Sequence, residues 1–108
     1  EVLQWLFHAA FDLAVGPAAA RYCKIFATPG LARAQENAHA FLALVEAHLA
    51  SQDWLALGRP TLADVACYPH AVLAPQGGIG LQDYSALRAW LARFEALPGY
   101  LPPPPLDA

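Results

Sequence analysis

The sequence predicts an all-α fold, a bundle of about five helices. Ala and Leu, which are strong helix formers, dominate the 108 residues. Pro and Gly are gathered in clusters that divide the chain into segments of helical length. No segment shows the alternation of polar and apolar residues that indicates a strand.

The composition restricts the class of protein. Hydrophobic residues make up 57% of the chain and charged residues 14%, with a net charge of -3. This balance excludes a disordered chain, and the few scattered Lys and Arg residues argue against a nucleic-acid partner. One domain of this size cannot bury so many apolar side chains, so we expect an apolar face that needs a partner.

Several other features are defined by their absence from the sequence. No apolar run is long enough for a membrane span and no signal peptide is visible, so we expect a cytoplasmic protein with no membrane partner. Cys23 and Cys67 form no Cys-x-x-Cys motif, which favours reduced thiols over a disulfide or a metal site. The chain contains no Met, even at position 1, and we expect a fragment or a processed product of a longer protein.

The first quarter of the chain predicts one bent helix. Residues 1–15 form an apolar segment that is interrupted at Gly16-Pro17, and residues 18–26 continue it after the bend. Apolar residues cover nearly every side of residues 1–15. Such a helix must be buried on more than one face, against this chain and against a second domain, a second subunit or a ligand.

A long amphipathic helix is predicted over residues 31–50, with Thr28 as its cap and Pro29 in its first turn. One face is an apolar stripe at helical spacing: Ala34, Ala38, Phe41, Leu42, Val45 and Leu49. The opposite face is expected to be solvated and carries Arg33, Glu36, Asn37 and Glu46.

The clearest local signal is the segment Thr61-Leu62-Ala63-Asp64, which has the form of a capping box. Thr61 is expected to cap the amide three residues on, and Asp64 to accept from the Thr61 amide. Loss of this cap alone predicts that Asp64→Ala costs about 1 kcal/mol or more. The helix that follows, residues 62–74, is apolar all round and is expected to be central, buried and kinked at Pro69.

The remaining segments are a loop, a helix and a tail. Residues 75–81 form a glycine-containing loop whose glycines need positive φ values. The last helix covers about residues 85–97 and ends at Pro98-Gly99. Residues 102–108 are a proline-rich tail, in which Pro102 to Pro105 can only be extended or polyproline-like.

Three possible sites have simpler structural explanations. Glu36 and His39 have Glu-x-x-His spacing, but di-iron sites need a second such pair, and none exists. The glycine loop follows a helix and lacks the phosphate-binding motifs. Ser51 and Ser85 lie at helix edges, where Ser usually caps, and nothing pairs them with a His base. We therefore predict no metal and no catalytic residue in this chain.

A family resemblance covers nearly the whole chain. It rests on Val2-Leu3-Gln4-Trp5-Leu6-Phe7, on Trp54-Leu55, on the run from Arg59 through the capping box to Pro69, on Ala74 to Ile79, and on Leu87 to Gly99. Together these segments resemble the C-terminal helical domain of a bacterial glutathione transferase. The opening helix is similar to that of the branch that includes disulfide-reducing homologues.

The resemblance implies a two-domain, detoxification-type enzyme. Residues 1–101 would be its helical domain, and the N-terminal thioredoxin-like domain, which carries the catalytic residue and most of the glutathione site, is absent from this chain. The intact protein would conjugate glutathione to apolar electrophiles or use it to reduce disulfides. The first and third helices would pair across a homodimer.

The resemblance also implies roles for individual residues. Phe7, Phe11, Arg21 and Tyr22 would belong to the wall of the second-substrate pocket. Arg33 matches by position an Arg that contacts the glutathione bound to the neighbouring subunit, where a cation would pair with a carboxylate. Surface roles for Arg21 and Arg33 remain open, and so does a non-catalytic role for the domain in binding or assembly.

Overall fold

The computed structural model describes residues 2–12 and 14–100, and the helical prediction is confirmed there. Five α-helices lie within these ranges, and no strand does: α1 (Val2–Ala10), α2 (Ala19–Phe26), α3 (Leu31–Leu49), α4 (Leu62–Val72) and α5 (Ser85–Glu95). A π-helix, η1 (Ala14–Ala18), precedes α2, and a 3-10 helix, η2 (Ala74–Gly77), follows α4. The predicted proline-rich tail, residues 102–108, lies outside the described residues.

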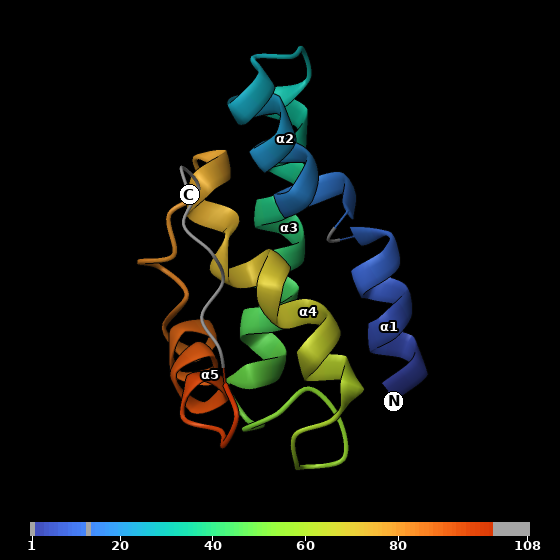
Figure 1. Cartoon of the computed structure of the whole chain (residues 1–108), viewed down its shortest axis with the longest axis vertical. Helices are drawn as coiled ribbons and strands as arrows, with labels where there is room; N and C mark the ends of the chain where they lie inside the picture. Colours follow the sequence, from blue (N-terminus) through green and yellow to red (C-terminus); the bar gives the residue numbers. More distant parts are fainter. Residues whose placement is uncertain (1, 13, 101–108) are drawn as a thin grey trace.

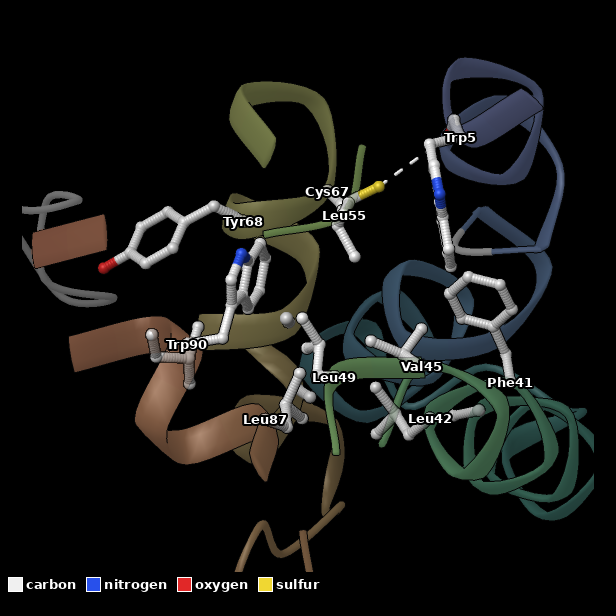
Figure 2. Packing of buried hydrophobic residues seen from close by; sticks show 14 of the residues in the cluster. Trp5, Phe41, Leu42, Val45, Leu49, Leu55, Cys67, Tyr68, Leu87 and Trp90 are labelled. Carbon is white, nitrogen blue, oxygen red and sulfur yellow. Dashed lines mark hydrogen bonds between the residues drawn. The ribbon is translucent and has the colours of Figure 1, made fainter. Parts of the chain in front are cut away.

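The helices are arranged around α4, which packs against α1 on one side and α5 on the other (Figure 1). α3 contacts η1, α2 and α5, and η2 packs onto α2. The predicted stripe of α3 is confirmed, because all six of its residues are buried: Ala34, Ala38, Phe41, Leu42, Val45 and Leu49. Figure 2 shows the larger of these side chains pointing into one cluster with Leu55, Leu87 and Trp90.

The first bend lies earlier than the sequence predicted. α1 ends at Ala10, and the chain passes through the π-helix η1 before α2 begins. A Cβ on Gly16 would lie only 2.9 Å from the Cα of Ala38, so glycine lets η1 approach the α3 backbone closely. Pro17, which has no N–H to donate, lies within the π-helical turn.

The expectation that Thr28 caps α3 is wrong. The capping position is Gly30, whose φ of 100° lies in the left-handed region that glycine tolerates. Its carbonyl accepts the first helical hydrogen bond, from the amide of Ala34 at 3.0 Å. The Thr28 hydroxyl is instead buried and has no hydrogen-bond partner among the described residues.

Glu46 is also not the solvated residue that the pattern predicted. Its carboxylate accepts from the amides of Ala86 at 2.9 Å and Leu87 at 2.8 Å, in the first turn of α5. A negative charge at this position also complements the positive end of the helix. α5 is therefore capped by a residue of α3 rather than by Ser85.

The capping box at the start of α4 is confirmed, and its Asp64 also binds groups outside α4. The Thr61 hydroxyl accepts from the amide of Ala63, one residue earlier than predicted, at 3.2 Å. The Asp64 carboxylate accepts from the amide of Thr61 at 2.9 Å, the amide of Leu55 at 3.1 Å and Nε1 of Trp90 at 2.8 Å. Asp64 is completely buried, so one side chain joins α4, the preceding loop and α5.

The prediction that α4 is buried all round is wrong on one face. Ala63, Cys67 and Ala71 point inward, whereas Leu62 is 66% exposed and Val65 is 55% exposed. The sequence pattern could not show this, because apolar residues on the two faces look alike. α4 therefore presents an apolar face to its surroundings.

The glycine loop after α4 serves packing. The positive φ values predicted for this loop are confirmed at Gly78, with a φ of 83°, but not at Gly77 or Gly80. A Cβ on Gly77 would lie 2.7 Å from the backbone nitrogen of Arg21. Only glycine at this position therefore lets η2 lie against the α2 backbone. The Gly77 carbonyl also accepts from Nε2 of Gln35 at 2.9 Å.

We predict that Asp64→Ala lowers the free energy of unfolding by about 3–5 kcal/mol, because buried N–H donors lose their acceptor. Urea unfolding followed by circular dichroism measures this loss. Thr61→Val, which removes only the hydroxyl cap, is the matched control and should cost about 1 kcal/mol. Equal losses for the two variants would contradict the joining role of Asp64.

Candidate functional site

A groove with a volume of about 670 Å³ lies between α1 and α3. We call it the α1–α3 groove. It is lined by His8, Phe11, Asp12, Val15, Arg33, Asn37, Ala40, Phe41 and Leu44. Its walls are mainly apolar, and its polar side chains are one cation, Arg33, one carboxylate, Asp12, the imidazole of His8 and the amide of Asn37. Such a groove can hold an apolar body that carries polar groups.

A histidine–aspartate pair, which the sequence prediction missed, lies at one side of this groove. Nδ1 of His8 lies 2.6 Å from Oδ2 of Asp12, one helical turn further on. The His8 ring packs between aromatic rings, with its centroid 5.1 Å from that of Trp5 and 5.4 Å from that of Phe41. The i, i+4 spacing of a His and an Asp was the signal that could have identified the pair.

An apolar stripe runs along the outer face of α1 and leads into the groove. Leu3 and Phe7 of α1, Phe11 just beyond its end and Val15 in η1 follow one another at intervals of four residues, and all four side chains are exposed. Side chains four apart lie on one side of a helix. Trp5 is the buried residue of α1. The side of the helix with Trp5 therefore packs on the core, and the side with the stripe is exposed.

The structure brings two of the five predicted site residues together. Phe11 and Arg33 both line the α1–α3 groove. Phe7 lies one turn before Phe11 on the exposed stripe, outside the groove. Phe11, Phe7 and Arg33 therefore belong to one side of the molecule.

Arg21 lies in a different place, in a pocket of about 150 Å³ lined by Pro17, Ala18, Pro69, His70 and Leu73. Its Nε donates to Oε1 of Gln76, which ties α2 to η2. Burial lowers the pKa of His70, the neighbouring titratable group in this pocket. This arrangement gives Arg21 a structural contact that the sequence did not indicate.

Tyr22 is separated from both sites. Its side chain is exposed, and its ring packs against Phe26 with centroids 4.8 Å apart. The π-helix between α1 and α2 accommodates an extra residue per turn, so the faces of the two helices do not continue one another. Phe11 lines the α1–α3 groove, whereas Tyr22 lines neither that groove nor the pocket that holds Arg21.

The remaining motif residues have structural partners. Nδ1 of His39 lies 2.7 Å from the Tyr84 hydroxyl, and His48 Nε2 lies 2.9 Å from the carbonyl oxygen of Leu55. Burial, with Asp83 and Glu46 nearby, raises the pKa of Tyr84. In the part of the chain that is described, no three His, Cys, Asp or Glu residues could hold a metal ion together.

The two thiols differ in their surroundings. Cys67 is buried, and its Sγ lies 3.8 Å from the carbonyl oxygen of Trp5, a contact that joins α4 to α1 (Figure 2). Burial, and then the charge of Asp64, raises the pKa of Cys67 to about 12. Cys23 is half-buried on α2. Cys67 is therefore held as a neutral packing residue rather than as a nucleophile.

Comparison with known proteins identifies the family. Residues 28–93 match the model of the glutathione S-transferase C-terminal domain. The chain belongs to this family. No significant match is found among curated proteins. Among residues 2–12 and 14–100, no helix is long and apolar enough to cross a membrane.

Solved glutathione S-transferases share the fold. One from Xanthobacter autotrophicus Py2 is 34% identical with a TM-score of 0.90, over 98% of this chain and 55% of that one. A possible transferase from Rhodopseudomonas palustris is 32% identical with a TM-score of 0.85, over 94% and 49%. One from Pseudomonas fluorescens Pf-5 is 24% identical with a TM-score of 0.88, over 94% and 54%. The chain thus spans about half of each.

We predict that only Cys23 reacts with an aromatic disulfide reagent in the folded protein at pH 8. A pKa of about 12 leaves roughly one Cys67 thiol in ten thousand ionised at this pH. Counting the released thiolate before and after unfolding in urea measures the difference. The Cys23→Ser variant should show no reaction until it unfolds, and rapid labelling of that folded variant would contradict the prediction.

Proposed function

We propose that this chain is the helical half of a glutathione-dependent enzyme that conjugates glutathione to apolar electrophiles or reduces disulfides with it. Membership of the transferase C-terminal family supports this proposal, together with a span of about half of each solved transferase. The other half would be a thioredoxin-like domain that supplies the catalytic residue. The helical half would supply surfaces that position the second substrate.

The proposal rests mainly on one observation: Phe11 and Arg33 line the same groove. Phe11 and Phe41 offer apolar surface to an electrophile, and Arg33 offers an exposed cation. A surface of this kind would hold the electrophile next to the glutathione thiolate. The reaction then takes place within one complex rather than between two freely diffusing molecules.

Arg33 fits a contact with one part of glutathione. The tripeptide carries two carboxylates, and a guanidinium binds a carboxylate through two parallel hydrogen bonds. The Arg33 side chain is exposed at the start of α3, with the amide of Asn37 one turn away in the same groove. In a dimer, the glutathione that Arg33 contacts would be the one bound to the neighbouring subunit.

Dimerisation through α1 and α3 accounts for the exposed apolar stripe. Phe7 and Phe11 are both about two-thirds exposed, at 66% and 65%, and such neighbouring aromatic rings in water indicate an interaction surface. Leu44 of α3 adds a further exposed apolar side chain across the groove. A twofold axis near this face would bury the stripe of one subunit against that of the other.

Substitution of Arg33 tests the role of the groove in catalysis. In the gene product that contains this chain, we expect Arg33→Ala to raise the KM for glutathione about 10-fold, as loss of a charged hydrogen bond predicts. The Arg33→Lys variant should have an intermediate KM for glutathione, because Lys keeps the positive charge but cannot form the two parallel hydrogen bonds of a guanidinium. Initial rates with an aryl halide and with a glutathione mixed disulfide give KM and kcat.

Arg59→Ala is the control, because Arg59 is exposed and lies outside the α1–α3 groove. An active enzyme with an unchanged KM in Arg33→Ala would contradict the assignment of Arg33. Absence of both activities from the intact wild-type protein would contradict the enzyme proposal and favour a non-catalytic binding module.

Dimer formation is tested separately. We expect Phe7→Glu with Phe11→Glu to make the intact protein monomeric, because two charges would be buried at the interface. Light scattering at two protein concentrations measures the mass. Leu57→Glu introduces a charge at an exposed leucine of the loop before α4 and should leave the dimer intact. A dimer that survives the double substitution would place the interface elsewhere.

A further inference from the structure

The pocket that holds Arg21 lies apart from the α1–α3 groove, between η1 and α2 on one side and the C-terminal half of α4 on the other. We call it the Arg21 pocket. Its volume of about 150 Å³ is enough for a six-membered ring. Two basic side chains, Arg21 and His70, line it. The other lining residues are apolar: Pro17, Ala18, Pro69 and Leu73.

Arg21 supplies the charge of this pocket. Burial lowers the pKa of His70, so its imidazole is neutral at pH 7. No Asp or Glu is among the lining residues. The pocket therefore combines a positive charge with an apolar wall, and this combination is complementary to an organic acid.

Arg21 is a half-buried cation without a carboxylate partner among the described residues. Of the 6 Lys and Arg residues in the chain, Arg21 and Arg93 are half-buried and the others are exposed. Arg93 lies 4.0 Å from the carboxylate of Asp53, whereas no acidic side chain within residues 2–12 and 14–100 forms such a pair with Arg21. Taking a guanidinium partly out of water is unfavourable unless an anion pairs with it, so Arg21 favours the binding of an anion.

The guanidinium of Arg21 is also held in position. Its Nε donates to Oε1 of Gln76 in η2. Neither of its two terminal amino groups has a hydrogen-bond partner in the part of the chain that the structure describes. These two groups form the planar fork that binds a carboxylate through two parallel hydrogen bonds.

We propose that the Arg21 pocket binds an organic acid with a compact apolar body, whose carboxylate pairs with Arg21 and whose ring or branched chain packs on Pro17, Pro69 and Leu73. The walls of this site all come from this chain, from η1, α2, α4 and the residue after α4. Binding requires neither glutathione nor Arg33. The inference therefore goes beyond the proposed function and is tested without it.

The size of the pocket favours a separate molecule over a side chain of another domain. An Asp or Glu side chain could pair with Arg21, but it carries only one or two methylene groups. Most of the apolar wall would then stay uncovered. An acid with a ring satisfies both the cation and the wall, and each buried CH₂ group adds about 0.8 kcal/mol.

Calorimetric titration of the intact gene product with benzoate tests the site. We expect one benzoate to bind per chain. Benzamide keeps the ring but lacks the charge, and acetate keeps the charge but lacks the ring, so each should bind about 10-fold more weakly or worse. Absence of benzoate binding would overturn the proposal, as would occur if a carboxylate of another domain already occupied Arg21. Equal affinity for benzamide would overturn the pairing with Arg21.

Substitutions locate the bound acid, with circular dichroism as the check on folding. Arg21→Met keeps an unbranched apolar side chain and removes the charge, so benzoate should bind about 10-fold more weakly or worse. Leu73→Phe keeps Arg21 and narrows the pocket, and it should weaken benzoate binding by a similar factor. Arg33→Ala changes the cation of the α1–α3 groove and should leave benzoate affinity unchanged. Unchanged affinity in Arg21→Met, or a loss of affinity in Arg33→Ala, would overturn the assignment.

Thermal melting supplies an independent readout. Benzoate at about ten times its dissociation constant should raise the melting temperature of the wild type, because it binds the folded state. The same concentration should raise the melting temperature of Arg21→Met less. An equal rise in the two proteins would contradict binding at Arg21.

Discussion

The carboxylate of Asp64 holds the centre of this domain together. It accepts hydrogen bonds from the Leu55 amide in the loop, from the Thr61 amide at the start of α4, and from the Trp90 indole of α5. A completely buried charge is unfavourable unless donors surround it, and these donors would be unsatisfied without the charge. One buried side chain therefore joins the loop, α4 and α5.

Local rules predicted the parts of the fold that depend on neighbours in sequence. The α3 stripe and the capping box followed from helical spacing and from a four-residue motif. The same rules failed where a partner comes from far along the chain. Glu46 looked like a surface residue, yet it caps α5 forty residues later. No pattern around Glu46 contains the position of Ala86, so only the tertiary structure could reveal the cap.

The candidate site illustrates the same division. Resemblance to the transferases selected both Phe11 and Arg33, and the fold placed them in one groove because η1 lies close against α3. It also selected Arg21 and Tyr22, which lie outside this groove, and their place in the substrate wall stays a prediction. The π-helix η1 lies between α1 and α2, and its wider turn changes the phase from one helix to the next. His8 and Asp12 were missed although their i, i+4 spacing could have identified the pair; their place at the groove required the position of α3.

The surplus of apolar residues now divides between two sides of α4. Beside α1, the exposed rings of Phe7 and Phe11 adjoin or line a groove whose polar side chains include Arg33 and Asp12. Beside α5, Leu62 and Val65 line a hollow together with the rings of Tyr68 and Phe94. The two surfaces differ in their polar groups, because the first includes Arg33 and Asp12 whereas the second is lined mainly by apolar and aromatic side chains. The high hydrophobic content therefore leaves exposed apolar side chains in two separate places, one at α1 and one at α4.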